Sequence, residues 1–249
     1  MSRPTVIVVP CYNEAARLRA DEFQEFASSQ SCVRFLFVND GSTDLTATVL
    51  ERLSSGAPHS FEVLDLPRNR GKAFAVREGM LRAFASNATF AGYWDADLAT
   101  PLREIPRFIE ALETSPERQI CMGARVQLLG RVIERRATRH YMGRVFATAA
   151  SLTLQLPVYD TQCGAKLFRV TPVTRALFAA PFITSWCFDV ELIARLVRDG
   201  RSAAGPTAAE LIYELPLEEW RDVAGSKVRP ADFMRAFVEI IRIRRSYMS

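Results

Sequence analysis

Short apolar runs alternate with longer amphipathic segments through the first half of the chain. The runs are rich in β-branched residues and have few polar positions, which is typical of strands buried on both faces. They predict strands at Thr5–Val9, Val33–Asn39, Phe61–Leu66, Phe90–Trp94 and Gln119–Met122. The segments between them predict helices at Glu14–Ser28, Thr43–Ser54, Lys72–Ser86 and Pro101–Thr114. This alternation indicates an α/β fold with a mostly parallel sheet and helices on both faces.

The second half of the chain is less regular and opens with a basic segment, Arg125–Arg144. The elements expected after it are a helix at Tyr141–Leu156, a loop at Asp160–Gly164, a helix around Trp186–Arg198 and a strand near Glu210–Leu215. The chain shows no internal repeat, low-complexity stretch or linker. We therefore expect a single domain over residues 1–229.

The tail, residues 230–249, is expected to form a basic amphipathic helix over Pro230–Tyr247. Apolar residues recur there at helical spacing among arginines: Phe233, Phe237, Ile240 and Ile241 with Arg235, Arg242, Arg244 and Arg245. Such a helix either packs on the core as part of the same domain or lies at a membrane interface against anionic lipid. The sequence leaves both interpretations open.

Composition narrows the class of protein only a little. With 249 residues, 49% of them hydrophobic, the chain can bury one substantial core, and its net charge of +4 makes it mildly basic. The five cysteines are scattered, and only His59 and His140 accompany them, so a zinc site is not expected. We interpret the cysteines as reduced and mostly buried.

The sequence contains no pattern of a membrane-spanning or secreted protein. No signal peptide precedes the first strand, and no apolar run approaches the ~20 residues that span a bilayer. The nearest candidate, Val145–Leu156, is too short and too polar. We expect a cytoplasmic protein that is either soluble or peripheral at the cytoplasmic face of a membrane.

The most informative pair of residues is Asp95 and Asp97, which follow the fourth predicted strand. In an extended strand their side chains would project from the same face. Carboxylates held so close repel one another unless a cation lies between them, and a hard divalent cation is the usual partner. Taken alone, the pair also fits a solvated Asp-rich turn.

Polar loops follow the other predicted strands as well. The first strand ends in Val9-Pro10-Cys11-Tyr12-Asn13-Glu14 and the second in Val38-Asn39-Asp40-Gly41-Ser42-Thr43-Asp44, where Asp40 suits a base or ribose contact and Ser42 or Thr43 a helix cap. Arg68-Asn69-Arg70-Gly71-Lys72 adds cations at the same sheet edge, which suits phosphate. Neither G-x-G-x-x-G nor a P-loop motif occurs, which disfavours dinucleotide and P-loop nucleotide binding.

The order of these motifs resembles the family 2 inverting glycosyltransferases of GT-A fold, a Rossmann-like arrangement. Three later motifs, Met122-Gly123-Ala124-Arg125, Asp160–Phe168 and Trp186–Glu191, resemble the branch containing dolichyl-phosphate glucosyltransferase and dolichyl-phosphate mannose synthase. Trp220–Lys227 makes the glucosyl type the closer one. The resemblance extends from about Thr5 to Lys227.

The resemblance implies a nucleotide-sugar cleft and a metal site. The cleft residues it implies are Pro10, Tyr12, Asn13, Glu14, Asp40, Lys72 and Asp95. Asp95 and Asp97 would hold Mg²⁺ or Mn²⁺ against the donor diphosphate, where a cation stabilises the leaving group. Mannose synthase-like members have a third oxygen ligand where this chain has Ala99. Either water completes the metal shell or metal affinity is reduced.

Asp160 corresponds to an acidic position near the acceptor in these enzymes. Together with the expected metal ligand Asp97, it is expected to be catalytic. A hydroxyl acceptor needs a general base, whereas a phosphate is already ionised and needs positioning. The segment Arg125–Arg144 holds six arginines and one acid, which suits an anionic group. We expect Arg125, Arg136 and Arg139 to contact the acceptor phosphate. Without interleaved aromatics or a binding motif, nucleic acid is disfavoured.

Three functions follow from these expectations. The first is metal-dependent transfer of a hexose, glucose by the glucosyl-type pattern, from a UDP-sugar to a polyprenyl phosphate. The second uses the same donor site with a soluble hydroxyl acceptor. The third is a catalytically silent nucleotide-binding protein, against which the intact Asp95, Asp97 and Asp160 argue. The sugar, the base and the oligomeric state are not determined by these motifs.

Overall fold

The structure is a computed structural model that describes residues 3–134, 137–201, 205–223 and 230–248. The side chains at 137–140 and 230–233 lie outside that description. Of the predicted site residues, Arg136 and the side chain of Arg139 therefore fall outside the described part of the chain. The same is true of Phe233 in the tail.

Seven of the described strands form one large sheet in the order β3-β2-β1-β4-β7-β5-β8. Their bounds are β1 Thr5–Cys11, β2 Val33–Asn39, β3 Phe61–Asp65, β4 Phe90–Trp94, β5 Ile120–Ala124, β7 Ala165–Arg169 and β8 Ile212–Pro216. All run parallel except β7, which pairs antiparallel with both β4 and β5. A small parallel sheet joins β6 (Val132–Glu134) to β9 (Glu219–Arg221). The predicted mostly parallel α/β sheet is confirmed.

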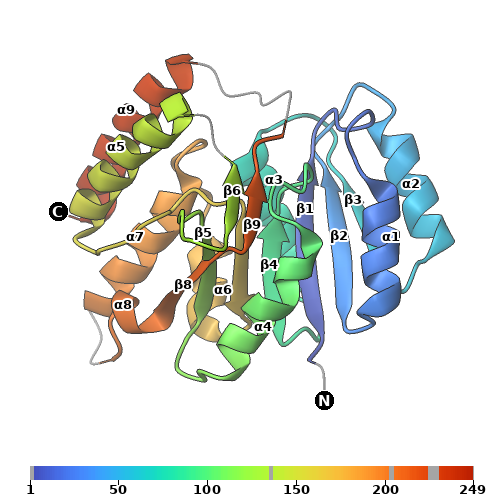
Figure 1. Cartoon of the computed structure of the whole chain (residues 1–249), viewed down its shortest axis with the longest axis horizontal. Coiled ribbons are helices and arrows are strands. Elements are labelled where there is room, and N and C mark those ends of the chain that lie inside the picture. Colours follow the sequence, from blue (N-terminus) through green and yellow to red (C-terminus); the bar gives the residue numbers. More distant parts are fainter. Residues whose placement is uncertain (1–2, 135–136, 202–204, 224–229, 249) are drawn as a thin grey trace.

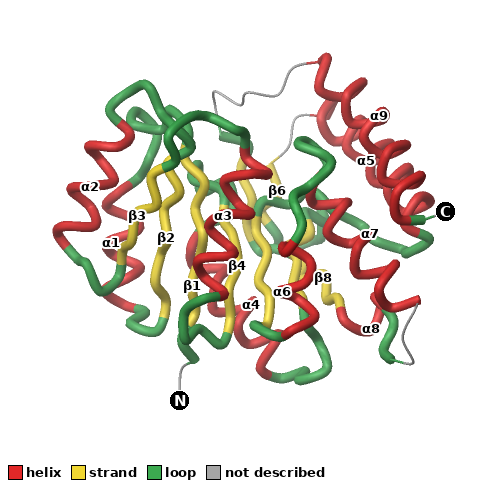
Figure 2. Tube along the Cα trace, turned by 180° about the vertical axis from the view of Figure 1, so that it is seen from behind, coloured by secondary structure: helices red, strands yellow, loops and turns green. Residues whose placement is uncertain are grey.

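Helices cover both faces of the large sheet, as Figures 1 and 2 show from opposite sides. One face carries α1 (Ala20–Ser29), α2 (Thr46–Gly56) and α4 (Ile105–Glu113), the last preceded by a 3₁₀ turn at Leu102–Glu104. The other face carries α3 (Lys72–Phe84), α5 (Ala137–Leu154), α6 (Pro172–Ala179), α7 (Phe188–Arg201), α8 (Ala208–Leu211) and α9 (Pro230–Tyr247).

Each central strand contributes to two cores because successive side chains point to opposite faces. In β1, Val6 and Val8 pack toward α3, whereas Ile7 and Val9 pack toward α1 and α2. All four side chains are buried. Burial on both faces explains why the strands appear in the sequence as uninterrupted apolar runs.

Several elements differ from the prediction. The helix expected at Glu14–Ser28 begins only at Ala20, because the backbone at Asn13 is left-handed (φ 52°) and Glu14 opens a turn. Ser42 and Thr43 do not cap α2, which has no side-chain cap. The elements β6, β7, β9, α6 and α8 were not predicted. Their short length makes their periodicity hard to recognise.

The register of the parallel strands brings the predicted site loops together. Cys11 of β1 lies opposite Asn39 of β2, which in turn lies opposite Asp65 of β3. The loops after β1, β2, β3 and β4 therefore gather at one edge of the sheet, the upper edge in Figure 1. Ligands of open α/β sheets bind beyond this carboxyl edge.

Two further expectations bear on the whole chain. The five cysteines are free, and four of them are buried, as predicted. Among the described helices, none is both long enough and apolar enough to cross a membrane.

Candidate active site

The loop after β1 is tied to the loop after β2 by Asn13. Its backbone N–H donates to Ser42 Oγ (3.0 Å), and its side-chain oxygen accepts from the Thr43 backbone N–H (2.8 Å). The Glu14 backbone N–H donates to Thr46 Oγ1 (2.8 Å). The Ser and Thr side chains expected to cap a helix thus join two loops instead. Asn13 thereby holds the loop after β1 against the loop after β2.

Asp40 fixes the basic loop that precedes α3. Its carboxylate accepts from the backbone N–H groups of Arg70 (2.9 Å) and Gly71 (2.8 Å). Burial raises the pKa of Asp40, while those two hydrogen bonds and the charge of Arg70 oppose the rise. Gly71 has φ 90°, a conformation that favours glycine, and Lys72 begins the helix directly after it. Asp40 therefore positions Lys72.

Asp95 and Asp97 lie in a tight turn and not in a strand, because β4 ends at Trp94. The Leu98 backbone N–H donates to Asp95 O (3.2 Å), and Leu98 adopts a left-handed backbone with φ 52°. The Ala99 N–H donates to the Asp97 carboxylate (3.1 Å). The pair follows the strand, as the sequence indicated, so the alternation of side chains in a strand does not apply to it. The turn nevertheless leaves both aspartates lining the same cavity.

The charges at this turn are close to one another. Lys72 Nζ lies 2.5 Å from Asp95 Oδ1. Burial lowers the pKa of Lys72, but the charges of Asp95 and Asp189 outweigh it, and the pKa is raised overall. Burial and the neighbouring charge of Asp95 raise the pKa of Asp97. A further cation at this turn would relieve the repulsion between the two aspartates.

The two aspartates fit a hard divalent cation. The described residues contain no group of three or more His, Cys, Asp and Glu side chains arranged to hold a metal. A pair of carboxylates at the edge of an open cavity matches Mg²⁺ or Mn²⁺ instead, since such ions bind one or two carboxylates together with substrate phosphates. Ala99, where the family resemblance implied the absence of a third ligand, is buried, and its backbone N–H donates to the Asp97 carboxylate.

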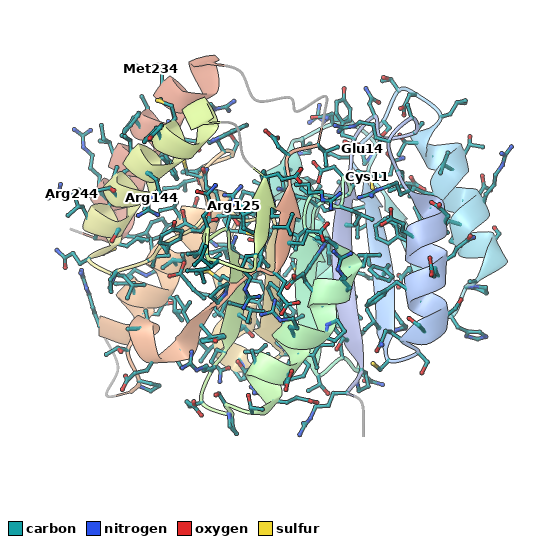
Figure 3. All side chains as sticks on the ribbon, viewed as in Figure 1. Cys11, Glu14, Arg125, Arg144, Met234 and Arg244 are labelled. Atoms are coloured by element: carbon teal, nitrogen blue, oxygen red, sulfur yellow. The ribbon has the colours of Figure 1, made fainter. Side chains whose placement is uncertain are left out.

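A cavity of about 380 Å³ opens over the ends of β1 and β4. Of the residues predicted for the nucleotide cleft, all but Asn13 line it: Pro10, Tyr12, Glu14, Asp40, Lys72 and Asp95. The predicted metal ligand Asp97 lines it as well. Figure 3 shows Cys11 and Glu14 at the upper end of β1, next to this opening. We call this space the donor cavity.

Arg17 also lines the donor cavity, although no sequence motif had pointed to this residue. Its guanidinium forms a two-point ion pair with the Glu14 carboxylate, with distances of 2.9 and 2.6 Å. Glu14 is thus held against Arg17, and the pair presents a cation beside Asp97, whose pKa Arg17 tends to lower. A guanidinium in this position suits a diphosphate.

A second cavity, of about 320 Å³, lies on the other side of the aspartates. It shares Lys72, Asp95 and Asp97 with the donor cavity, and most of its other lining residues belong to the second half of the chain. They include Arg125, Phe146, Gln162, Trp186, Asp189, Trp220 and Asp222. We call this space the acceptor cavity. The two cavities meet at the three shared side chains.

Arg125 and Asp160 are paired with each other. The Arg125 side chain donates to both carboxylate oxygens of Asp160 (2.6 and 2.8 Å), and its backbone N–H donates as well (3.1 Å). Its guanidinium lies 5.3 Å from the centre of the Trp220 ring. Glu214 in turn accepts from the backbone N–H of Asp160 (2.8 Å). Asp160 therefore positions Arg125, which lines the acceptor cavity.

Two other arginines of the basic segment contact residues outside the acceptor cavity. Arg131 pairs with Glu218 (3.2 Å). Arg144 donates to the carbonyl of Tyr159 (3.2 Å) and lies 4.0 Å from the centre of its ring. Within the described side chains, Arg125 is the predicted phosphate contact that reaches the acceptor cavity.

A buried polar cluster lies beside the acceptor cavity and was not predicted as functional; its member Asp189 lines the cavity. Asp189 accepts from Lys166 Nζ (2.5 Å) and from the Tyr93 hydroxyl, and all three side chains are buried. Burial and the charge of Asp189 raise the pKa of Tyr93. The motif Trp186–Glu191 contains Asp189, but its position next to Lys166 arises from the antiparallel strand β7, which pairs with β4.

Gly164 is a second residue whose importance appears only in three dimensions. Its carbonyl accepts from the Asp95 backbone N–H (3.1 Å). A Cβ atom at this position would lie 1.9 Å from Asp95 Oδ2. Only glycine leaves space for the Asp95 carboxylate at the meeting point of the two cavities.

Residues 6–175 match the sequence family described as glycosyl transferase family 2. The chain is 34% identical over 247 residues to dolichyl-phosphate beta-glucosyltransferase of Drosophila melanogaster, covering 90% of this chain and 69% of that protein. It is 28% identical over 262 residues to the protein of the same name from Saccharomyces cerevisiae, covering 97% and 74%.

Two solved structures are similar to this one. A mannosyltransferase from Pyrobaculum calidifontis in complex with GDP-Man and Mn²⁺ has a TM-score of 0.63 at 16% identity, covering 97% of this chain and 65% of that one. Glucosyl-3-phosphoglycerate synthase from Mycobacterium tuberculosis, in complex with Mn²⁺ and UDP-glucose, has a TM-score of 0.66 at 18% identity, covering 97% and 79%. At sequence identities this low, the similarity shows that the fold is shared and shows nothing about the ligands of this chain.

Proposed function

This chain belongs to glycosyl transferase family 2, and we propose that it transfers glucose from UDP-glucose to a polyprenyl phosphate with inversion at the anomeric carbon. Relatives that match most of the chain are named dolichyl-phosphate beta-glucosyltransferases, which supports both the sugar and the kind of acceptor. The fold is the GT-A arrangement that the sequence led us to expect.

The observation that carries the proposal is the pair of cavities meeting at Lys72, Asp95 and Asp97. One cavity is lined by the residues that the family resemblance assigns to the nucleotide, and the other contains Arg125. A donor and an anionic acceptor bound in these cavities would bring their reacting atoms to the shared residues. Holding two reactants in this way is itself a large part of catalysis.

Asp95 and Asp97 are the residues that would hold Mg²⁺ or Mn²⁺, which supplies Lewis-acid stabilisation of the departing diphosphate. Lys72 adds a second positive charge at the same point, and Arg17 adds a third in the donor cavity. Positive groups already in place where negative charge develops favour the transition state over the ground state.

The acceptor side favours a phosphate over a hydroxyl. Two of its carboxylates are engaged by cations, Asp189 by Lys166 and Asp160 by Arg125. Such carboxylates are poor general bases, because the neighbouring positive charge stabilises their ionised form. A phosphate acceptor is already ionised and needs no base, and Arg125 offers it a guanidinium. We infer that Asp160 acts through Arg125.

A soluble hydroxyl acceptor remains the second candidate, because Asp222 also lines the acceptor cavity and carries a carboxylate. The first proposal also includes Mg²⁺ or Mn²⁺ as the metal. It further places the protein peripherally at the cytoplasmic face of a membrane. The named activity of the relatives supports a membrane location, since their acceptor is a lipid.

Transfer assays decide between these acceptors. We expect UDP-glucose, with Mg²⁺ or Mn²⁺, to glucosylate a short polyprenyl phosphate, and we expect chelation of the metal to abolish the reaction. The product is measured by chromatography of the lipid. Robust transfer to a water-soluble alcohol, with none to polyprenyl phosphate, would contradict the first proposal and support the second.

The metal assignment has its own test. Asp97→Ala is expected to lower kcat/KM by about a thousandfold, because the leaving group loses its cation. Asp199→Ala, an exposed aspartate on α7, is the matched control and should retain wild-type kcat/KM. Wild-type turnover by the Asp97 variant would show that the metal is held elsewhere or is not needed.

A further inference from the structure

The helices α5 and α9 expose apolar side chains that no described part of the chain covers. On α5 these are Tyr141, Val145 and Leu152, and on α9 they are Met234, Val238 and Ile241. Within each helix the residues are three, four or seven positions apart, so they form a stripe along one side. We call the two stripes together the apolar face.

The opposite sides of the same helices are buried. Phe146, Ala150 and Leu154 of α5 and Ile240 and Ile243 of α9 belong to the core. The tail helix therefore packs on the core, as one of the two sequence interpretations expected. Packing and surface contact do not exclude each other here, because Ile240 and Ile241 point to different sides.

The two stripes face the same way. Helices α5 and α9 contact each other, and both contact α7. Since α7 is buried over Phe188–Leu196, it lies beneath the pair, and their exposed sides point away from it. Figures 1 and 2 show α5 and α9 side by side at one outer corner of the molecule.

Positive charge borders the apolar face along α9. Exposed arginines follow α9 at positions 235, 242, 244 and 245, and Figure 3 shows Met234 and Arg244 toward opposite ends of that helix. The sequence of α5 contains no acidic residue. The acids of α9 are Asp232 and Glu239, and the side chain of Glu239 is buried. An apolar stripe bordered by arginine matches anionic lipid.

The two helices that carry the apolar face also line the acceptor cavity. Gly143 and Phe146 of α5 and Ala236 of α9 line that cavity from the inner side of the same two helices. Glu239 of α9 also accepts from the backbone N–H groups of Trp186 (2.9 Å), which lines the cavity, and of the adjacent Cys187 (2.8 Å). A lipid whose phosphate enters the cavity would have its hydrocarbon chain near this face.

We propose that the apolar face of α5 and α9 docks the protein on a membrane that contains anionic lipid. The apolar side chains enter the interface between headgroups and acyl chains, and the arginines of α9 contact lipid phosphates. We prefer a membrane to a protein partner partly because the acceptor in the proposed function is a lipid, and to that extent the inference rests on the proposed function. The charge pattern supports it independently.

Flotation with vesicles tests the proposal without any catalysis. The full chain is mixed with vesicles of phosphatidylcholine, with or without phosphatidylglycerol, and the bound fraction is measured. We expect binding that requires phosphatidylglycerol and weakens as salt is raised. Val145→Asp and Val238→Asp are each expected to weaken it by about tenfold or more, since an apolar side chain is withdrawn from the membrane.

Val173→Asp on α6 is the matched control. Its side chain is 45% exposed, compared with 55% for Val145 and 57% for Val238, and it lies outside the apolar face. Vesicle binding should be unchanged in this variant. Circular dichroism verifies that each variant is folded. Because there is one variant on each helix, the test can still be made if one of them does not fold.

The outcomes separate this inference from the proposed function. Loss of vesicle binding in the α5 and α9 variants, with transfer to a short water-soluble prenyl phosphate unchanged, supports docking. The docking proposal would be overturned if the wild-type protein did not bind anionic vesicles. It would also be overturned if the two variants and the control bound the vesicles equally well. Self-association that is lost in Val238→Asp, without vesicle binding, would assign the face to a second copy of the chain. Vesicle binding without any transfer would leave docking intact and reject the proposed acceptor.

Discussion

At the scale of single residues, the site depends on how closely the backbone approaches the Asp95 carboxylate. The Lys72 ammonium lies 2.5 Å from one of its oxygens, and the Gly164 backbone occupies the opposite side. Asp95 has little freedom to move between them. A carboxylate fixed in this way needs no reorganisation to bind a cation.

Gly164→Ala is expected to lower kcat/KM by about a hundredfold, because the new methyl group displaces the Asp95 carboxylate by the order of an ångström. Steady-state kinetics with saturating metal measures the loss. Gly200→Ala is the control, since the nearest atom to its Cβ lies at 3.8 Å. Equal activity of the two variants would mean that the position of Asp95 is unimportant.

At the scale of elements, α9 is joined to α7 by a buried carboxylate. Glu239 accepts from the backbone N–H groups of Ser185, Trp186 and Cys187, at the start of α7, and Arg235 lies 3.3 Å away. Burial alone would raise the pKa of Glu239, but these three hydrogen bonds lower it overall. The tail helix thereby holds one wall of the acceptor cavity.

Glu239→Gln is expected to reduce the free energy of unfolding by about 1–3 kcal/mol at neutral pH, because buried N–H groups lose a charged acceptor. A lowered folded-state pKa contributes stability above the unfolded value of 4.5 and loses it as the pH falls. The difference between wild type and variant should therefore shrink below pH 4.5.

Urea unfolding of both proteins between neutral and acidic pH measures this difference. Glu51→Gln, at an exposed position of α2, serves as the control and should show no such trend. A gap between wild type and Glu239→Gln that stays constant with pH would show that the carboxylate charge does not support the α7 start.

At the scale of the whole molecule, strand β7 joins the two halves of the sheet. It lies between β4 and β5 and runs against both. Phe168 of β7 is buried with its ring 6.0 Å from that of Tyr93 and 5.3 Å from that of Phe178. The regular first half and the irregular second half therefore share one core.

Phe168→Ala is expected to cost about 3–5 kcal/mol of unfolding free energy, since it leaves a cavity where the halves of the sheet meet. Chemical denaturation followed by circular dichroism measures the cost. Leu129→Ala, at a fully exposed position, should change the stability by no more than about 0.5 kcal/mol. A small cost at Phe168 would mean that the halves fold independently of this contact.

The parallel core of the fold was predictable from the residues. Strands buried on both faces must be apolar throughout, so the segments that became β1, β2 and β4 were identified closely. The place of Asp95 and Asp97 was predictable too, because they directly follow a buried strand, and both line one cavity. The start of α1 was not, since it depends on a left-handed Asn13 that other loops hold in place.

The acceptor side was predicted less well, for a physical reason. Asp160 and Arg125 were chosen for separate roles, yet they form an ion pair across 35 positions of sequence. Asp189 and Lys166 are likewise joined only because β7 lies beside β4. Charges that neutralise each other appear in a sequence as independent candidates, because a sequence does not show distance.

The residues alone determined the α/β fold, the edge of the sheet at which chemistry occurs and the family. Each of these depends on local patterning or on motif order, which are properties of the sequence and do not require tertiary contacts. Only the tertiary structure decided which charges cancel, which glycine must stay small and which sides of α5 and α9 face outward. Those features arise from contacts between segments far apart in the chain, and they exist only once the chain has folded.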